Sequence, residues 1–195
     1  MDHPHIGTLN EGSLHQALKA HYGSPDARYE IPVDGFVADI VDEDGIIEIQ
    51  TGSFGSLKRK LPTLLADHRV TLVYPVALVR HIVKVGDEEA TRRKSPKRGS
   101  LFDLFGELVY VPLLLDHPNL AIDVVGIEED ELRVFDGKKG RRRKGWVVAG
   151  RRLVEVLEIL RQRSAQRRCA TRVPVHAGQV GDVRLFRAGH GLHGH

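Results

Sequence analysis

The chain has 195 residues, 41% of them hydrophobic, and a formal net charge of +3, which suits one domain or one domain with an appended module. Its longest apolar runs fall well short of the ~18 residues that a membrane-spanning helix needs, so the sequence excludes a membrane partner. The N-terminus has no apolar signal segment, and a single cysteine, Cys169, excludes a disulfide within the chain. We therefore expect a cytoplasmic protein.

The charges are distributed unevenly along the chain. Residues 1–90 carry 8 Lys and Arg against 14 Asp and Glu, whereas residues 91–195 carry 21 against 12. An acidic half suits a metal site and a basic half suits a polyanion. The alternative is that both halves are ordinary solvated surfaces.

The first part of the chain alternates between helical and strand patterns. Leu14 and Leu18 recur at helical spacing, and Gly23 ends that helix. The predicted elements are a helix at 9–23, strands at 28–33, 35–41 and 46–50, a helix at 53–68, and strands at 70–76 and 80–85. This order, α-β-β-β-α-β followed by a further strand, predicts an α/β fold.

The second part is less regular. A polar loop at 86–99 precedes Ser100, a predicted N-cap. The predicted elements are then a helix at 101–117, paired strands at 120–127 and 131–135, a basic loop at 136–145, a strand at 146–150 and a helix at 151–163. Leu153, Val156, Leu157 and Leu160 share one face of that last helix.

Polar side chains interrupt two apolar strands. Asp39 lies in the strand at 35–41, and Glu48 and Gln50 lie in the strand at 46–50. A turn at 42–45 would bring Asp39 and Glu48 close together on one face of the hairpin. Two adjacent carboxylates repel each other, and a hard cation such as Mg²⁺ removes that conflict. Asp39, Glu48 and the backbone carbonyl of Ile49 are the predicted metal ligands, unless this face is simply solvated.

The segment at roughly 8–80 resembles the PD-(D/E)xK nuclease superfamily, whose fold is that of many restriction endonucleases. The metal-binding Asp of that family corresponds to Asp39 in "VADIV", and its (D/E)xK motif corresponds to "EIQ", from Glu48 to Gln50. Gln50 departs from the family, which usually has Lys there. In other members the lysine lies on the following helix, where Lys58 and Lys60 stand.

The resemblance implies roles for individual residues and a cofactor, Mg²⁺, with Mn²⁺ as its substitute. The implied catalytic residues are Glu11, Asp39, Glu48, Gln50 and Lys58. Lys58 is preferred to Lys60 because it lies nearer the strand end. Glu11 also fits a capping box with Thr8, and both roles are compatible. His15, one turn beyond Glu11, fits an ordinary surface histidine better than a phosphate contact.

Two basic segments fit contacts to a nucleic-acid backbone. The predicted contact residues are Arg92, Arg93, Lys94, Lys97 and Arg98 in the first segment and Lys138, Lys139, Arg141, Arg142, Arg143 and Lys144 in the second. Trp146 follows the second segment and can stack on a base, although a core position at the start of a strand is favoured.

The resemblance implies an α/β, restriction-endonuclease-like core with a mixed sheet at residues 1–85. We expect a basic linker at 86–99, a basic α+β accessory region at 100–165 and a flexible tail at 166–195. The expected function is metal-dependent hydrolysis of phosphodiester bonds in DNA. The alternatives are a catalytically inactive nuclease-fold module that binds nucleic acid, and a protein that docks an acidic partner. DNA is the expected partner, and a homodimer is left open.

Overall fold

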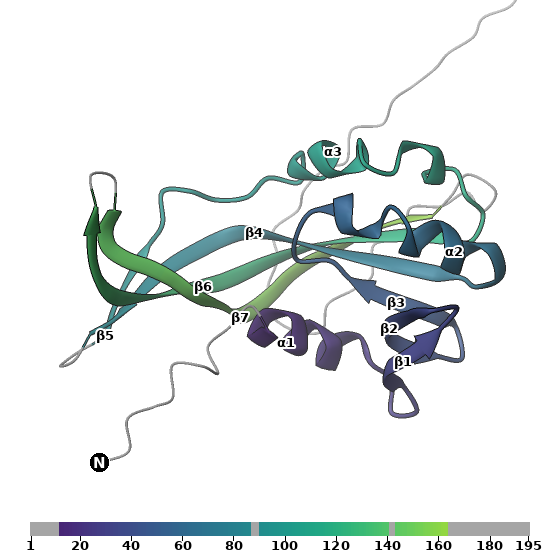
Figure 1. Ribbon diagram of the computed structural model, residues 1–195, viewed down its shortest axis with the longest axis horizontal. Coiled ribbons are helices and arrows are strands. Elements are labelled where there is room, and N and C mark those ends of the chain that lie inside the picture. The colour runs from purple at the N-terminus through teal and green to yellow at the C-terminus, as the bar shows by residue number, and fades with distance from the viewer. Residues whose placement is uncertain (1–11, 87–89, 141–142, 164–195) are drawn as a thin grey trace, which may run out of the picture.

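The computed structural model describes residues 12–86, 90–140 and 143–163, whose strands form one open, mixed, seven-stranded sheet (Figure 1). The sheet order is β1-β2-β3-β4-β6-β7, and β5 pairs with the far end of β4. The elements are α1 (Gly12–Tyr22), β1 (Arg28–Val33), β2 (Phe36–Asp42), β3 (Gly45–Ile49), the 3₁₀ turn η2 (Phe54–Leu57), α2 (Lys60–Asp67), β4 (Val70–Val85), β5 (Ala90–Lys94), α3 (Asp103–Leu108), the 3₁₀ turn η3 (Pro112–Leu114), β6 (Leu120–Gly140) and β7 (Arg143–Arg163). The expected α/β class with a mixed sheet is confirmed.

The order of elements from α1 to β4 is the expected α-β-β-β-α-β. Strand β2 is antiparallel to both β1 and β3, whereas β4 is parallel to β3. Asp34 and Gly35 join β1 to β2 with φ values of 48° and 81°, the positive values that a two-residue type I′ turn requires. A helix must carry the chain back between the parallel strands β3 and β4, and α2 does so.

Helices cover both faces of the sheet (Figure 1). Leu14 and Leu18 of α1 pack on one face with a buried cluster that includes Ile40 and Val73. The other face is covered by η2 and α2, whose leucines are buried as their spacing predicts: Leu57, Leu61, Leu64 and Leu65. The predicted helix at 53–68 is interrupted, because α2 begins at Lys60. Pro62 then lies in the first turn, where its missing N–H costs no helical hydrogen bond.

The predicted helix at 101–117 is mostly irregular. Only α3 and η3 are helical, and they form a segment that runs across the face covered by α2 (Figure 1). Pro112 disfavours helical geometry at the preceding residue, and Val111 has φ −136° and ψ 39°. Ser100 caps the turn before α3, because its hydroxyl accepts from the Phe102 amide at 3.2 Å while its own amide donates to Asp103 at 2.9 Å.

Three strands, β4, β6 and β7, are longer than the sequence predicts. The predicted strands at 70–76 and 80–85 are one strand, β4, and those at 120–127 and 131–135 are one strand, β6. A bulge between Ala77 and Val79 absorbs the interruption in β4. At about 3.3 Å per residue, a strand of this length is long enough to leave the body of the protein. Far from the helices, β4, β5, β6 and β7 form a projecting arm (Figure 1).

The prediction of a helix at 151–163 is wrong, because these residues form the second half of β7. The pairing of β6 with β7 shifts register where Val154 and Leu157 lie unpaired, so each is a bulge. Each bulge adds one residue to the strand and resets its alternation. Leu153, Val156 and Ile159 therefore share one face at a spacing of three and pack with α1. That spacing imitates the period of a helix.

The predicted division of the chain at residues 86–99 does not divide the sheet. Part of that segment is β5, which pairs with β4, and β6 and β7 continue the same sheet beyond β4. The expected accessory region therefore shares its sheet with the expected core. The tail at 166–195 lies outside the described residues. Among the residues that are described, no helix is long and apolar enough to cross a lipid bilayer.

The strand assignment at 151–163 makes a prediction about stability. Ile159 is 7% exposed and Val154 is 45% exposed. Ile159→Ala should lower the free energy of unfolding by about 2–4 kcal/mol, because it opens a cavity in a packed core. Val154→Ala should cost under about 1 kcal/mol. Urea unfolding of both variants measures this, and a larger effect at Val154 than at Ile159 would contradict the assignment.

Candidate functional site

The candidate site lies where β2 and β3 separate. Their pairing runs from Asp42 and Gly45 to Ile40 and Ile47 and stops there. One residue further on, the Asp39 carboxylate accepts a hydrogen bond from the Ile49 amide at 2.9 Å. The Asp39 side chain thus supplies the acceptor that the β2 backbone no longer offers to β3. This hydrogen bond fixes the Asp39 carboxylate at the fork between the two strands.

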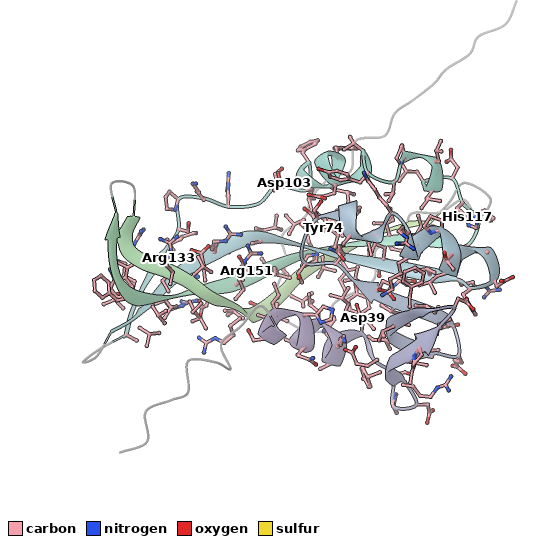
Figure 2. All side chains as sticks on the ribbon, viewed as in Figure 1. Asp39, Tyr74, Asp103, His117, Arg133 and Arg151 are labelled. Atoms are coloured by element: carbon pink, nitrogen blue, oxygen red, sulfur yellow. The ribbon has the colours of Figure 1, made fainter. Side chains whose placement is uncertain are left out.

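Asp39 receives two further partners from α1, and Figure 2 shows it beside that helix. His15 Nε2 lies 3.1 Å from Oδ2, and Lys19 Nζ lies 3.2 Å from Oδ1. These residues are four apart and so share one face of the helix. Burial opposes the ionisation of Asp39, but the hydrogen bonds from His15 and Ile49 and the charge of Lys19 lower its pKa to about 2. Asp39 is therefore an anion at neutral pH.

Lys19 is a buried lysine that bridges two carboxylates. It is 2% exposed, and its Nζ contacts Glu30 as well as Asp39. Burial lowers the pKa of Lys19, but hydrogen bonds and charge from Glu30 and Asp39 outweigh burial and raise it. Glu30 has a φ of 54°, a conformation that costs free energy for a residue with a Cβ and is concentrated at functional sites. Lys19 was not among the predicted site residues, although a lysine next to Leu18 in an amphipathic helix was a signal.

Glu48 takes its partner from α2. Its side chain is buried, and Oε2 contacts Nζ of Lys60, which also donates to the Val37 carbonyl at 2.7 Å. Within the part of the chain that the structure describes, Glu48 Oε1 has no hydrogen-bond partner. Burial raises the pKa of Glu48 more than Lys60 lowers it, and the negative charge of Asp39 adds to the rise. The pKa values of the two carboxylates are therefore shifted in opposite directions.

Asp39 and Glu48 do not lie side by side on a regular hairpin, as the sequence analysis expected. Glu48 alternates with Ile47 and Ile49, which pack on the α1 side, and so it faces α2. Asp39 turns toward α1 because the ladder has ended. The two residues still interact at the fork, where the charge of Asp39 raises the pKa of Glu48 and the backbone amide of Asp39 lowers it.

The structure separates the two lysines that follow β3. Lys58 is exposed and lies over the Tyr110 ring, 5.0 Å from its centroid. Lys60 instead contacts Glu48, so the preference for Lys58 over Lys60 was wrong as a matter of position. Lys58 lies before the first turn of α2, where the chain still curves away toward α3.

Gln50 closes the turn after β3. Its Nε2 donates to the Ser53 carbonyl at 2.9 Å and to Ser56 Oγ at 3.2 Å. The same residue donates its amide to the Val73 carbonyl at 2.9 Å. Its side-chain nitrogen is thus engaged within the turn. Glu11, the other implied catalytic residue, lies outside the described residues.

The predicted metal ligands meet only in part. Because the Val73 carbonyl binds the Gln50 amide, the parallel ladder leaves the N–H and C=O of Ile49 directed toward β2. The Ile49 carbonyl therefore lies on the same side as Asp39. Among the described residues, no group of three or more His, Cys, Asp or Glu side chains is placed to hold a metal ion.

The first basic segment has two kinds of residue. Arg92 is bound to carboxylates in the arm, with Nε 2.9 Å from Asp130 and Nη2 3.0 Å from Glu128. Its charge is thereby balanced, so it does not belong with the predicted phosphate contacts. The other four side chains are exposed: Arg93, Lys94, Lys97 and Arg98.

The second basic segment forms the end of the β6–β7 hairpin. Arg141 and Arg142, and the side chains of Lys138, Lys139, Arg143 and Lys144, lie outside what the structure describes. Trp146 is half-buried in the arm, edge-on to Phe135 at 5.6 Å and beneath Lys84 at 4.8 Å. Trp146 therefore packs within β7, but it does not take the favoured core position, because it belongs to neither buried cluster.

The fold and site define an α/β protein whose open mixed sheet holds two carboxylates at a strand fork, the partly buried Asp39 and the buried Glu48, each paired with a lysine. The chain belongs to the family described as "Domain of unknown function (DUF8091)", whose family model matches residues 12–163. A protein of Treponema pallidum (strain Nichols) with the name "Uncharacterized protein" is 38% identical over 154 residues, or 77% of this chain. The chain spans 61% of that relative's length. No solved structure matches the chain.

The opposite pKa directions of Asp39 and Glu48 predict opposite effects of pH. The pKa of Asp39 falls from 3.8 to about 2 on folding. Its ionisation therefore stabilises the fold above pH 4, and this stabilisation is lost as the pH falls toward 2. Wild-type protein should lose about 2 kcal/mol more free energy of unfolding across that interval than Asp39→Asn. Urea unfolding at several pH values measures this.

Glu48→Gln provides the comparison of opposite sign. Because the pKa of Glu48 is raised above 4.5, its ionisation costs stability as the pH rises through the folded value. Glu48→Gln should remove that loss. Parallel curves for wild type and both variants would show that neither carboxylate has a perturbed pKa.

Proposed function

We propose that this chain hydrolyses phosphodiester bonds in DNA with a divalent cation, as a variant of the PD-(D/E)xK nucleases. One observation carries the proposal: Asp39 on β2, Glu48 on β3 and Lys60 on α2 converge at a strand fork. These are the residue types that the motif requires, and they lie on the second strand, the third strand and the following helix of an α-β-β-β-α-β unit.

Another residue can compensate for the missing lysine at position 50. The family's lysine supplies positive charge beside its second carboxylate, and Gln50 cannot supply it. Lys60 contacts Glu48 from α2 and so supplies that charge in this chain. Gln50 instead holds the turn between β3 and η2, on which the direction of α2 depends.

The donor set fits a hard cation such as Mg²⁺, which prefers carboxylate and carbonyl oxygens. Glu48 Oε1 is a buried oxygen without a partner among the described residues, and such an atom is costly unless a cation or water contacts it. Asp39, Glu48 and the Ile49 carbonyl would hold the ion. A bound Mg²⁺ would polarise the phosphate and activate water.

The remaining chemistry falls to the chain's own groups. Lys60 would stabilise negative charge on the phosphate while it keeps Glu48 oriented. Lys19 and His15 would hold Asp39 ionised and fixed in direction, because the hydrogen bond from His15 and the charge of Lys19 lower its pKa. The exposed residues Arg93 and Lys94 would bind the DNA backbone without reading its sequence.

A second function, binding of nucleic acid without cleavage, is favoured by the ion pairs. Asp39 contacts Lys19 and Glu48 contacts Lys60, so each carboxylate already has a cation. A site balanced in this way binds Mg²⁺ less strongly than two free carboxylates. Cleavage in the presence of Mg²⁺ or Mn²⁺ decides between the two functions.

The nuclease proposal predicts a ranking of variants. Asp39→Ala and Glu48→Gln should abolish Mg²⁺-dependent cleavage of plasmid or single-stranded DNA. Lys60→Ala should slow it by ~10²-fold, as expected for a group that assists the reaction directly. Arg59→Ala is the matched control, since it removes an exposed basic side chain one residue away.

Equal rates for Lys60→Ala and Arg59→Ala would exclude a role for Lys60 in the reaction. If wild-type protein binds DNA but cleaves no duplex, single-stranded or branched substrate with either metal, the binding function replaces the nuclease. Rates should be measured in single turnover, so that slow release of product does not hide the effect.

DNA binding should depend on one part of the first basic segment. Replacing Arg93, Lys94, Lys97 and Arg98 with Ala should weaken binding of all sequences and lower the slope of log K against log salt by about 0.9 for each phosphate that is no longer neutralised. Arg92→Ala should leave that slope unchanged but lower the unfolding midpoint, because buried Asp130 loses a partner. Fluorescence anisotropy at several salt concentrations tests this. A slope that changes only in Arg92→Ala would contradict the assignment.

A further inference from the structure

The segment at 101–115, here called the strap, crosses the α2 face of the sheet. One side of the strap packs on the core below it. Val111 is buried there, and four leucines are partly buried against the same cluster: Leu101, Leu104, Leu108 and Leu114. The strap is therefore anchored by its own apolar side chains, and its outer side is free to serve another purpose.

The outer side of the strap is also apolar. Phe102 is 76% exposed and Phe105 is 63% exposed. The same side carries Val109, Tyr110 and Leu113. Of the twelve large hydrophobic residues that are exposed in the described part of the chain, six lie on this strap. An exposed apolar patch of this kind usually marks a binding surface.

Two of these residues form an open aromatic stack. The rings of Phe102 and Phe105 lie 6.1 Å apart with an angle of 29° between their planes. Both rings are mostly exposed, so the stack has room for another flat ring. Nucleobases stack on aromatic side chains in this way, with little dependence on base identity.

Basic side chains lie next to the strap in sequence and over one of its rings. The exposed side chains of Lys97 and Arg98 immediately precede the strap, and Lys58 lies over the Tyr110 ring. The strap has two carboxylates of its own, and both accept hydrogen bonds from backbone amides. Asp103 accepts from Ser100 at 2.9 Å, and Glu107 accepts from Phe54 at 2.8 Å. Aromatic rings among cations favour a ligand that is both flat and anionic.

The strap is joined to the candidate site. Glu107 binds the amide of Phe54 in the turn that follows Gln50, and the Tyr110 ring lies against Gly55 of the same turn. Gln50 holds this turn from the other side through Ser53 and Ser56. The strap also lies on the face toward which Glu48 and Lys60 are directed.

We propose that the strap binds the unpaired bases of a single DNA strand, with Phe102 and Phe105 as the stacking platform and Lys97, Arg98 and Lys58 as the phosphate contacts. The inference rests on the proposed function and narrows its substrate. A duplex keeps the faces of its bases covered by their neighbours, whereas a single strand, a frayed end or a branch exposes them. The preferred substrate therefore contains unpaired nucleotides close to the scissile bond.

The test compares single-stranded and duplex DNA on matched variants. Fluorescence anisotropy gives Kd for a labelled oligo-dT of about 20 nucleotides and for a duplex of equal length. Phe102→Ala/Phe105→Ala should weaken single-strand binding by about 10-fold or more and leave duplex binding within about 2-fold. Phe102→Trp/Phe105→Trp should restore single-strand binding, and its added tryptophan fluorescence should be quenched by oligo-dT.

Val109→Ala is the control for a purely apolar contact, since Val109 is 67% exposed on the same strap but cannot stack on a base. An equal loss in this variant would overturn the proposal in favour of an apolar protein partner. A dimer that disappears in Phe102→Ala/Phe105→Ala during analytical ultracentrifugation would assign the strap to a second copy. Unchanged single-strand affinity in the Ala variant would also overturn it.

These outcomes are separate from those of the nuclease proposal. Binding is measured without divalent cations and also with Asp39→Ala, which removes the proposed chemistry. If wild-type protein cleaves no DNA but still prefers single strands through Phe102 and Phe105, the strap inference stands and the nuclease fails. If cleavage occurs but the strap variants bind and cleave normally, the strap inference fails alone.

Discussion

The candidate site depends on a single hydrogen bond, from the Ile49 amide to the Asp39 carboxylate. A buried strand amide must find an acceptor, and β2 no longer offers one because it has left β3. Asp39 supplies the acceptor, and this fixes an anion between two layers of the protein. Lys19 is then required on the α1 side, because an isolated buried carboxylate is too costly to keep ionised.

The backbone of β1 is also irregular beside the fork. Glu30 has a left-handed φ at the point where β1 and β2 leave it unpaired opposite Asp39, and its carboxylate contacts Lys19. A left-handed backbone, a break in the sheet and the ion pairs of the buried Lys19 thus coincide. A chain selected for stability alone would close this fork with an ordinary ladder. Their coincidence is what we expect where a site needs a carboxylate in a fixed direction.

The sequence predicted most reliably what depends on short-range pattern. The α-β-β-β-α-β order and the burial of Leu61 and Leu64 follow from periodicity and turn residues. The strand β7 could not be recognised, because the bulges at Val154 and Leu157 give it a helix-like spacing. The roles of Lys19 and Lys60 depended on where the helices begin and how they cross the fork. A one-turn change in a helix start decides whether Lys58 or Lys60 reaches Glu48.

The charge of the basic half illustrates a further limit of composition. The carboxylates of β6 are buried in the arm, and arginines from three strands neutralise them: Glu129 pairs with Arg80, and Asp130 pairs with Arg92 and Arg152. A charge count treats these arginines as available to a polyanion, whereas the fold uses them to balance carboxylates that would otherwise be buried without a partner. The positive surface is consequently smaller than the sequence suggests. Four exposed basic side chains remain between Arg93 and Arg98, shortly before the aromatic strap, so that positive charge and exposed aromatic rings lie on one continuous stretch of chain.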